Sequence, residues 1–293
     1  MTEAIGIDIG GTRIKAAAVG GDGVVGEAVR RPTVGDPRGL VSAVRETLEA
    51  LRGPDVPVGI AAPGLAAKDG GSIAWMRGRM EALEGLDWSA ALGRSVRVLN
   101  DGHAATLAEA WCGAAAGCRN VVMLTLGTGV GGGVLLGGRL LTGASGRAGH
   151  LGHITIDRSG PADIVGTPGS LEDLVGDHTV YARTGFASTR ELVAAVADGN
   201  EEAARHWRAV VHALACGVVG LINVFDPEAV VIGGGIATAG DALFVPLRCE
   251  MDALEWRPFG EGVPVLPAAL GDLAGAVGAG RFALLNTQQE IGV

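Results

Sequence analysis

Aromatic side chains are scarce in this chain of 293 residues: phenylalanine, tryptophan and tyrosine together account for 4% of it. Hydrophobic residues nevertheless make up 48%, so any core must be built largely from alanine, valine, leucine and isoleucine. A length of this order favours two domains, each large enough to bury a core of its own.

Positive charge is also short, because 23 lysines and arginines face 32 aspartates and glutamates and leave a net charge of −9. Clustered basic residues are needed to bind a nucleic-acid backbone, so this balance disfavours nucleic acid as a partner. No uninterrupted apolar run approaches the length of a membrane span, and the first residues lack the pattern of a signal peptide. We therefore expect a cytoplasmic protein without a membrane partner.

Cysteine is rare as well. The four cysteines, Cys112, Cys118, Cys216 and Cys249, form no Cys-x-x-Cys pair and lie in acidic surroundings that are poor in histidine. This usage is typical of small buried hydrophobic residues in a reducing compartment.

Glycine, by contrast, is abundant, with 50 residues, and three glycine clusters each follow an apolar segment that is typical of a strand. The clusters are Gly10, Gly11 and Thr12; Gly127, Thr128 and Gly129; and Gly233, Gly234 and Gly235. Glycine permits positive φ and lets backbone N–H groups approach an anion closely. A loose hairpin turn would explain any one cluster, but three that end strands are harder to attribute to composition.

The order of expected elements indicates the fold class. Strands are expected over residues 4–7, 13–19 and 24–28, followed by a helix over 37–52 and a strand over 56–61. Three strands, a helix and a strand are typical of the opening of an actin-like domain. A Rossmann unit would place a helix directly after the first glycine turn.

The rest of the chain alternates strands and helices without a long linker. We expect strands over 96–99, 121–124, 134–136 and 229–232, and helices over 87–92, 104–116, 171–181, 189–197, 201–224 and 273–285. We expect an N-terminal small domain over residues 1–110, completed by residues 281–293, and a larger C-terminal domain over 111–280.

Short motifs follow one another in a fixed order along nearly the whole chain. They are DIGGTRIK at 8–15, APG at 62–64, LNDG at 99–102, LTLGTGVGGG at 124–133, AGHLGH at 148–153, DPEAVVIGGG at 226–235 and GAVGA at 275–279. This ordered set resembles the ROK sugar kinases of the actin/hexokinase/Hsp70 superfamily. The resemblance implies an α/β fold of two RNase-H-like (actin-like ATPase) domains with a cleft between them. It also implies ATP on the C-terminal domain, with its phosphates between the first two glycine clusters and a hexose at the hinge.

The resemblance assigns the role of general base to Asp101. It would accept the proton of a sugar hydroxyl as that oxygen attacks the γ-phosphorus. Its neighbour Asn100 both donates and accepts hydrogen bonds, which suits a sugar hydroxyl. Asn-Asp-Gly after an apolar strand is also an ordinary turn signal, and taken alone it would be interpreted as a turn.

Phosphoryl transfer also needs anion donors and cations on the phosphates. The first two glycine clusters would supply the donors, and the third would pack under the adenine and ribose or form a plain strand-to-helix turn. Asp8 ends the first strand and suits a Mg²⁺ shell, although an aspartate there also caps turns. Lys15 is expected at the phosphates, or else as a solvated lysine at a sheet edge.

Two departures from the family bear on metal and substrate. Many members hold zinc through the histidine at position 153 and three cysteines in the segment that here reads DIVGTPGS, residues 163–170. Val165 cannot ligate a metal, and one histidine with Asp163 is too few for structural zinc, so we expect no zinc. Pro161 and Pro168 would stiffen the loop instead.

The second departure is His150, where the family usually has a glutamate that contacts sugar hydroxyls. This makes glucose a doubtful substrate, unless His150 has swung out and water fills the gap. The resemblance implies a sugar site that comprises Gly64, Asn100, Asp101, His150, His153 and Glu172. His153 would contact the sugar without a metal, or else lie in the core bonded to backbone.

We therefore expect an ATP- and Mg²⁺-dependent kinase, a homodimer, that phosphorylates a hydroxyl, O6, of a hexose or hexose derivative. One alternative is a sugar-sensing regulator without catalysis, since the family includes repressors with a winged helix-turn-helix. We expect no such domain here, because the first strand begins near residue 4. A sugar-binding protein that has lost catalysis is disfavoured by the retention of Asp8, Asp101 and both phosphate turns.

Overall fold

The computed structural model describes residues 3–51, 56–77 and 80–290. The chain divides into two compact units, each of which is assembled from separate segments. Unit 1 comprises Met1–Gly117, Leu140–Ala148 and Ala269–Val293, and unit 2 comprises Cys118–Arg139 and Gly149–Ala268. We expected the division after residue 110 and the return at 281; the chain leaves unit 1 after Gly117 and returns for the last time at Ala269.

Unit 1 contains a five-stranded sheet in the order β3-β2-β1-β4-β7. Its strands are β1 (Ala4–Ile9), β2 (Arg13–Val19), β3 (Val25–Pro32), β4 (Val58–Ala62) and β7 (Val96–Asn100). β1 pairs antiparallel with β2 and parallel with β4, which itself pairs parallel with β7. The carboxyl ends of β1, β4 and β7 therefore meet at one edge, where the chain continues into Gly10, Pro63 and Asp101.

Unit 2 repeats this arrangement in the order β10-β9-β8-β11-β12. The strands are β8 (Val121–Leu126), β9 (Val130–Leu136), β10 (Arg139–Leu140), β11 (Ala229–Gly233) and β12 (Val265–Pro267). β8 pairs antiparallel with β9 and parallel with β11, as β1 does with β2 and β4. Two sheets of the same order confirm the predicted α/β fold with two RNase-H-like domains.

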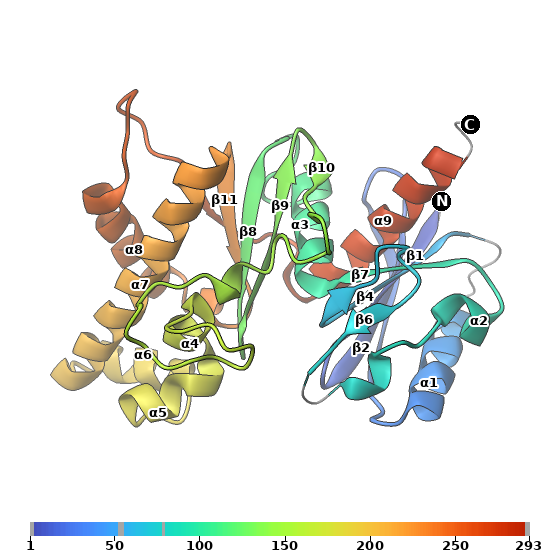
Figure 1. Cartoon of the computed structure of the whole chain (residues 1–293), viewed down its shortest axis with the longest axis horizontal. Helices are drawn as coiled ribbons and strands as arrows, with labels where there is room; N and C mark the ends of the chain where they lie inside the picture. The colour runs from blue at the N-terminus through green and yellow to red at the C-terminus, as the bar shows by residue number, and fades with distance from the viewer. Residues whose placement is uncertain (1–2, 52–55, 78–79, 291–293) are drawn as a thin grey trace. The chain divides into compact units, whose positions relative to one another are not determined.

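Helices cover both faces of the unit 1 sheet. On one face α1 (Pro37–Ala50) and α2 (Trp88–Leu92) bury residues such as Leu40 and Trp88 against the strands. On the other lie α3 (Asp101–Cys112) and α9 (Ala274–Glu290), which Figure 1 shows beside the sheet. A Cβ on Gly6 or Gly59 would collide with the backbone of α9, so these glycines let helix and sheet pack closely.

The segments of unit 2 outside its sheet contain the helices α4 to α8, joined by turns and loops. The long helix α7 (Glu201–Phe225) packs against α4 (Leu171–Val175), α6 (Thr189–Ala197) and α8 (Asp241–Leu254), as Figure 1 shows. By length and composition alone α7 could cross a membrane, but its most apolar 18-residue stretch is 56% buried. Its contacts on several sides indicate a core helix, as its apolar pattern predicts.

Two predicted helices need correction, and two further elements were missed. The helix expected over 171–181 is interrupted, because α4 ends at Val175 and a short 3-10 turn (Asp177–Thr179) precedes α5 (Val180–Thr184). The helix expected from residue 104 begins at Asp101. The helix α8 and the strand β12 were not predicted at all.

The cysteines are less buried than predicted. Cys112, Cys118 and Cys216 are half-buried, and Cys249 is exposed. The expectation that all four cysteines are buried hydrophobic residues is therefore wrong.

Two carboxylates, one buried and one exposed, fix the chain beside points where it passes between the units. Glu109, on α3, is fully buried and accepts hydrogen bonds from the N–H groups of Ala114, Ala269 and Leu270, at 2.7–3.1 Å. In unit 2, Glu228 accepts from the N–H groups of Arg119 and Asn120, both at 2.7 Å. A carboxylate that receives several backbone N–H groups replaces the partners that regular secondary structure would have supplied.

Candidate active site

The end of β7 and the start of α3 position the predicted catalytic pair. The Asn100 side chain caps the helix, because its Oδ1 accepts from the N–H groups of Gly102 (2.9 Å) and His103 (3.2 Å). Its Nδ2 donates to the carbonyl oxygen of Gly64 at 3.0 Å. The structure thus brings Gly64, Asn100 and Asp101 together, and the Asn-Asp-Gly sequence starts a helix rather than forming a reverse turn.

Asp101 is the first residue of α3, and its Oδ1 accepts from the Gly102 N–H at 2.8 Å. Burial raises the pKa of Asp101 above its ordinary value, while the hydrogen bond from Gly102 and the charge of Lys15 act in the opposite direction. A carboxylate whose pKa is raised is a better proton acceptor than an ordinary surface aspartate.

Asp8 and Lys15 face each other directly across β1 and β2. The Lys15 Nζ lies 3.5 Å from Asp8 Oδ2, which rules out a fully solvated edge lysine. Burial nevertheless raises the pKa of Asp8 to about 6, against the effect of Lys15, and the nearby Asp101 carboxylate raises it further. Unit 1 therefore carries two electrostatically coupled carboxylates with a single lysine beside them.

The first glycine cluster forms the turn between β1 and β2. Gly10 donates its N–H to the Arg13 carbonyl at 3.0 Å, and its own carbonyl accepts from Thr33 Oγ1 at 2.6 Å. Gly11 and Thr12 are exposed. Gly10 and Gly11 do not have positive φ, so the turn does not require glycine at these positions for its backbone conformation.

The second glycine cluster, Gly127, Thr128 and Gly129, forms the turn between β8 and β9, and we call it the second glycine turn. A Cβ on Gly129 would collide with the carboxylate of Glu172, which accepts from the Val130 N–H at 2.9 Å. A larger residue at position 129 would therefore have to displace the end of the Glu172 side chain. The structure places the predicted sugar-site residue Glu172 directly against the predicted phosphate turn.

Unit 2 contains a cavity of about 710 Å³ beside the second glycine turn. Gly127, Thr128 and Gly235 line it, so two of the predicted clusters contribute to one space. Gly233 and Gly234 do not line it; Gly234 has φ +91° and packs against the backbone of Leu126. The volume lies within the usual range for small-molecule sites.

Sequence reasoning missed the opposite wall of this cavity. It is formed by Asp177 in the 3-10 turn, by residues at the start of α6, namely Ser188, Thr189, Arg190 and Val193, and by Ile236, Thr238 and Ala239. The side chain of Ser188 caps α6, and Asp177 Oδ1 accepts from the Thr189 N–H at 2.6 Å. The Ser-x-x-Glu pattern at 188–191 signals a helix start, but nothing local relates that start to the glycine turns.

The remaining predicted sugar-site residues lie on other parts of unit 2. His150 is half-buried and precedes the 3-10 turn Leu151–His153. His153 Nδ1 lies 2.8 Å from Asp163 Oδ2. Its partner is therefore a carboxylate, and the alternative of a core histidine bonded to backbone is wrong.

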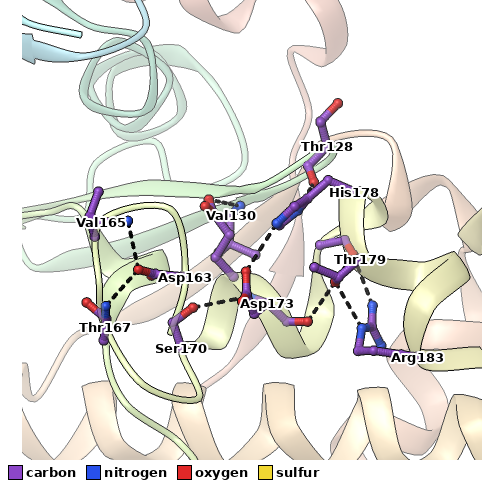
Figure 2. A network of polar contacts seen from close by, with 12 residues as sticks. Thr128, Val130, Asp163, Val165, Thr167, Ser170, Asp173, His178, Thr179 and Arg183 are labelled. Carbon is purple, nitrogen blue, oxygen red and sulfur yellow. Dashed lines mark hydrogen bonds and ion pairs between the residues drawn. The ribbon is translucent and has the colours of Figure 1, made fainter. Parts of the chain in front are cut away.

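In residues 163–170, the segment compared above with the zinc-binding segment of other family members, hydrogen bonds hold the loop together (Figure 2). Asp163 Oδ1 accepts from the N–H groups of Val165 (3.0 Å) and Thr167 (2.8 Å), and Ser170 Oγ caps α4. Burial alone would raise the pKa of Asp163, but the hydrogen bonds, that from His153 foremost, hold it below its usual range. Val165 offers no ligand atom, so these side chains do not fit a zinc ion.

A sequence profile described as "ROK family" matches residues 4–287. The chain belongs to the ROK family. The chain is 33% identical to the glucokinase of Thermotoga maritima, over 94% of this chain and 95% of that protein. It is 30% identical to the kanosamine kinase of Amycolatopsis mediterranei, over 98% of each. It also resembles the crystal structure of the ROK family glucokinase of Streptomyces griseus in complex with glucose and AMPPNP, with a TM-score of 0.81, 28% identity, and coverage of 96% of this chain and 99% of that one.

In this ROK protein Asp8 is the residue that fits a Mg²⁺ ion carried with a nucleotide. It is a mostly buried carboxylate whose ionisation is costly without a compensating charge, and Lys15 compensates it only in part. Hard cations prefer carboxylate oxygen and water. No group of three or more histidine, cysteine or acidic side chains in the described part of the chain is arranged to hold a metal by itself.

Proposed function

We propose that this ROK protein is a sugar kinase that transfers the γ-phosphoryl group of ATP to a hydroxyl, O6, of a hexose or hexose derivative. The observation that carries the proposal is the start of α3, where Asp101 has a raised pKa beside the fixed side chain of Asn100. The similarity to glucokinase and kanosamine kinase supports the class of reaction.

The proposed chemistry places the proton on Asp101. As the sugar hydroxyl oxygen forms its bond to the γ-phosphorus, Asp101 accepts the hydroxyl proton. The bond between the γ-phosphorus and the bridging oxygen breaks, and its electrons leave with ADP. Asn100 uses its Oδ1 for the helix cap and one Nδ2 hydrogen for Gly64, and its side chain also hydrogen-bonds Asp101, so it fixes the position of the proposed base.

We assign the base and ribose of the nucleotide to the 710 Å³ cavity of unit 2, and its phosphates to the second glycine turn. The expectation from the sequence that Gly10, Gly11 and Thr12 also contact the phosphates remains part of this proposal. Lys15 and a Mg²⁺ ion at Asp8 would supply the positive charge. Mg²⁺ neutralises charge that develops on the phosphate oxygens during transfer.

The sugar would be read by His150, His153 and Glu172 as well as by Asn100 and Asp101. Because Glu172 also bonds the Val130 N–H, one of its oxygens is already engaged and the other remains for a hydroxyl. The homodimer and the cytoplasmic location expected from the sequence remain parts of this proposal.

The test is to mix the purified protein with ATP, Mg²⁺ and a panel of hexoses, N-acetylated and free amino sugars and cyclitols, and to measure ADP. We expect ADP to form only when a suitable sugar is present. The control without sugar measures background hydrolysis. Binding of a sugar without ADP formation would instead support a sugar-sensing regulator, and 31P NMR of the product would show which hydroxyl is phosphorylated.

A further inference from the structure

A short segment after α4 holds the second glycine turn from outside the hairpin (Figure 2). Asp177 donates its N–H to the carbonyl of Gly127 at 2.9 Å. His178 makes two bonds to the carbonyl of Thr128: one from its backbone N–H at 2.9 Å, and one through its ring Nδ1 at 2.8 Å.

These bonds set the direction of the peptide groups in the turn. In a planar trans peptide the C=O and the following N–H point in opposite directions. When the carbonyls of Gly127 and Thr128 point at residues 177 and 178, the N–H groups of Thr128 and Gly129 point away from them. Neither of these two N–H groups forms a hydrogen bond with any residue that the structure describes. Adjacent N–H groups directed the same way are suited to an anion.

The His178 ring is itself held on its other side. Its Nε2 lies 3.1 Å from Asp173 Oδ1, whose side chain is only 14% exposed. Asp173 is fixed by the cap at Ser170 and by Thr179, whose Oγ1 donates to the Asp173 carbonyl at 2.7 Å. The imidazole is therefore a strut between a rigid part of α4 and the Thr128 carbonyl.

Gly176 makes this approach possible. A Cβ at Gly176 would lie 2.9 Å from the Thr128 carbonyl oxygen and 2.7 Å from that of Glu172. The Gly176 carbonyl accepts from Arg183 Nη2 at 3.0 Å, so the segment is anchored on both sides. The whole segment is thus built to meet the turn.

We infer that His178 is a positioning residue for the phosphoryl donor: through the Thr128 carbonyl it directs the Gly129 N–H toward the phosphates. This rests on the proposed use of ATP, and it assigns to His178 an effect on the phosphates and none on the nucleoside. Nδ1 carries a proton in this contact, because a carbonyl oxygen only accepts hydrogen bonds.

The experiment compares His178→Ala, His178→Asn and His178→Gln with the wild type by calorimetric titration with ATP and with adenosine. Asparagine places its amide nitrogen near the position of Nδ1 and can still donate to Thr128, whereas glutamine places it near Nε2. We expect about tenfold weaker ATP binding in the alanine and glutamine variants, as for the loss of one of the hydrogen bonds that hold the turn, and recovery in the asparagine variant. Adenosine, which has no phosphates, should bind all four proteins equally.

A matched control is His212→Ala. Like His178, His212 is paired with a carboxylate: its Nδ1 lies 2.8 Å from Glu250 Oε2. This pair is on α7 and α8, outside the turn. This variant should bind ATP like the wild type. The inference is overturned if adenosine binding falls as much as ATP binding, or if glutamine restores binding better than asparagine. Both readouts are binding constants, so a protein that binds ATP but phosphorylates no sugar would refute the proposed function and leave this inference standing.

Discussion

The Nε2 atom of His103 lies 2.8 Å from the carbonyl oxygen of Ala148. His103 is on α3, two residues after Asp101, and Ala148 ends the segment Leu140–Ala148 that unit 1 receives from the middle of the chain. A carbonyl oxygen accepts, so Nε2 must carry the proton. Burial lowers the pKa of His103, although the bond to Ala148 acts in the opposite direction.

This gives a pH dependence with a defined sign. Below about pH 6.5 the unfolded chain takes up a proton at His103 more readily than the folded protein does, so the free energy of unfolding falls as pH falls. The slope from one such group is at most about 1.4 kcal/mol per pH unit. We expect His103→Gln to reduce the slope of the free energy of unfolding against pH between pH 5 and 6.5, as measured by unfolding in urea. The control His206→Gln, at a half-buried position on α7, should keep the wild-type slope; an unchanged slope in His103→Gln would contradict the assignment.

Replacement of Asp101 should separate catalysis from folding. Asp101→Asn keeps the shape but cannot accept a proton, so kcat should fall on the order of 10²-fold or more while ATP binding persists. Because the raised pKa means that the ionised carboxylate is costly in the folded state, the variant should melt no lower than the wild type. Activity measured by coupled ADP release and melting by circular dichroism test both statements. A variant that retains most of its turnover would show that Asp101 is not the base.

The Asp163 cluster predicts a protein that needs no zinc. Elemental analysis of the purified protein should find far less than one zinc per chain, and a strong chelator should leave the melting temperature unchanged. Asp163→Ala should lower stability by about 1–3 kcal/mol, because two backbone N–H groups lose their acceptor. Asp157→Ala is the control, since Asp157 is exposed and caps only Ser159 in the same loop. About one zinc per chain would overturn the prediction.

His150 predicts an unusual sugar preference. A glutamate there would only accept hydrogen bonds and would attract an ammonium group, whereas a neutral histidine donates at one nitrogen and accepts at the other. We expect glucose to be a poor substrate and an epimer, a derivative or a cyclitol to be preferred. Cationic amino sugars should also be disfavoured, in contrast to the preference that the name of the kanosamine kinase relative implies.

The measurement is kcat/KM across the sugar panel for the wild type and His150→Glu. The glutamate variant should move the ranking toward glucose and toward free amino sugars. A wild type that already ranks glucose first, with no shift in the variant, would refute this role for His150.

Local signals in the sequence predicted most of the elements. The strand β2 (Arg13–Val19) and the helix α6 (Thr189–Ala197) have the bounds that we expected. The helix α8 was missed because Pro246 lies inside it and argues against a helix there. The helix α3 starts earlier than expected because the Asn100 side chain supplies its N-cap. The sequence Asn-Asp-Gly is equally compatible with a turn, so it did not indicate this start.

Contacts between distant residues are what local patterns could not predict. His178 is 50 residues from Thr128 in the chain, and no periodicity or motif relates the two. The cavity wall at Thr189 and the Glu172–Val130 bond are of the same kind. Resemblance to a family identified the glycine turns as candidates, but only coordinates show which backbone groups are held and which are left for a ligand.

The bonds of Glu109 determine how this protein can be recombined with its relatives. A chimera joined after residue 110, where the sequence alone suggested a domain limit, would take Ala114 from the other parent and place it against this Glu109 carboxylate. Junctions after Gly117 and before Ala269 instead keep Glu109 with all three of its backbone donors, Ala114, Ala269 and Leu270. An exchange of residues 118–268 between ROK proteins should therefore give more stable hybrids than an exchange of residues 111–280.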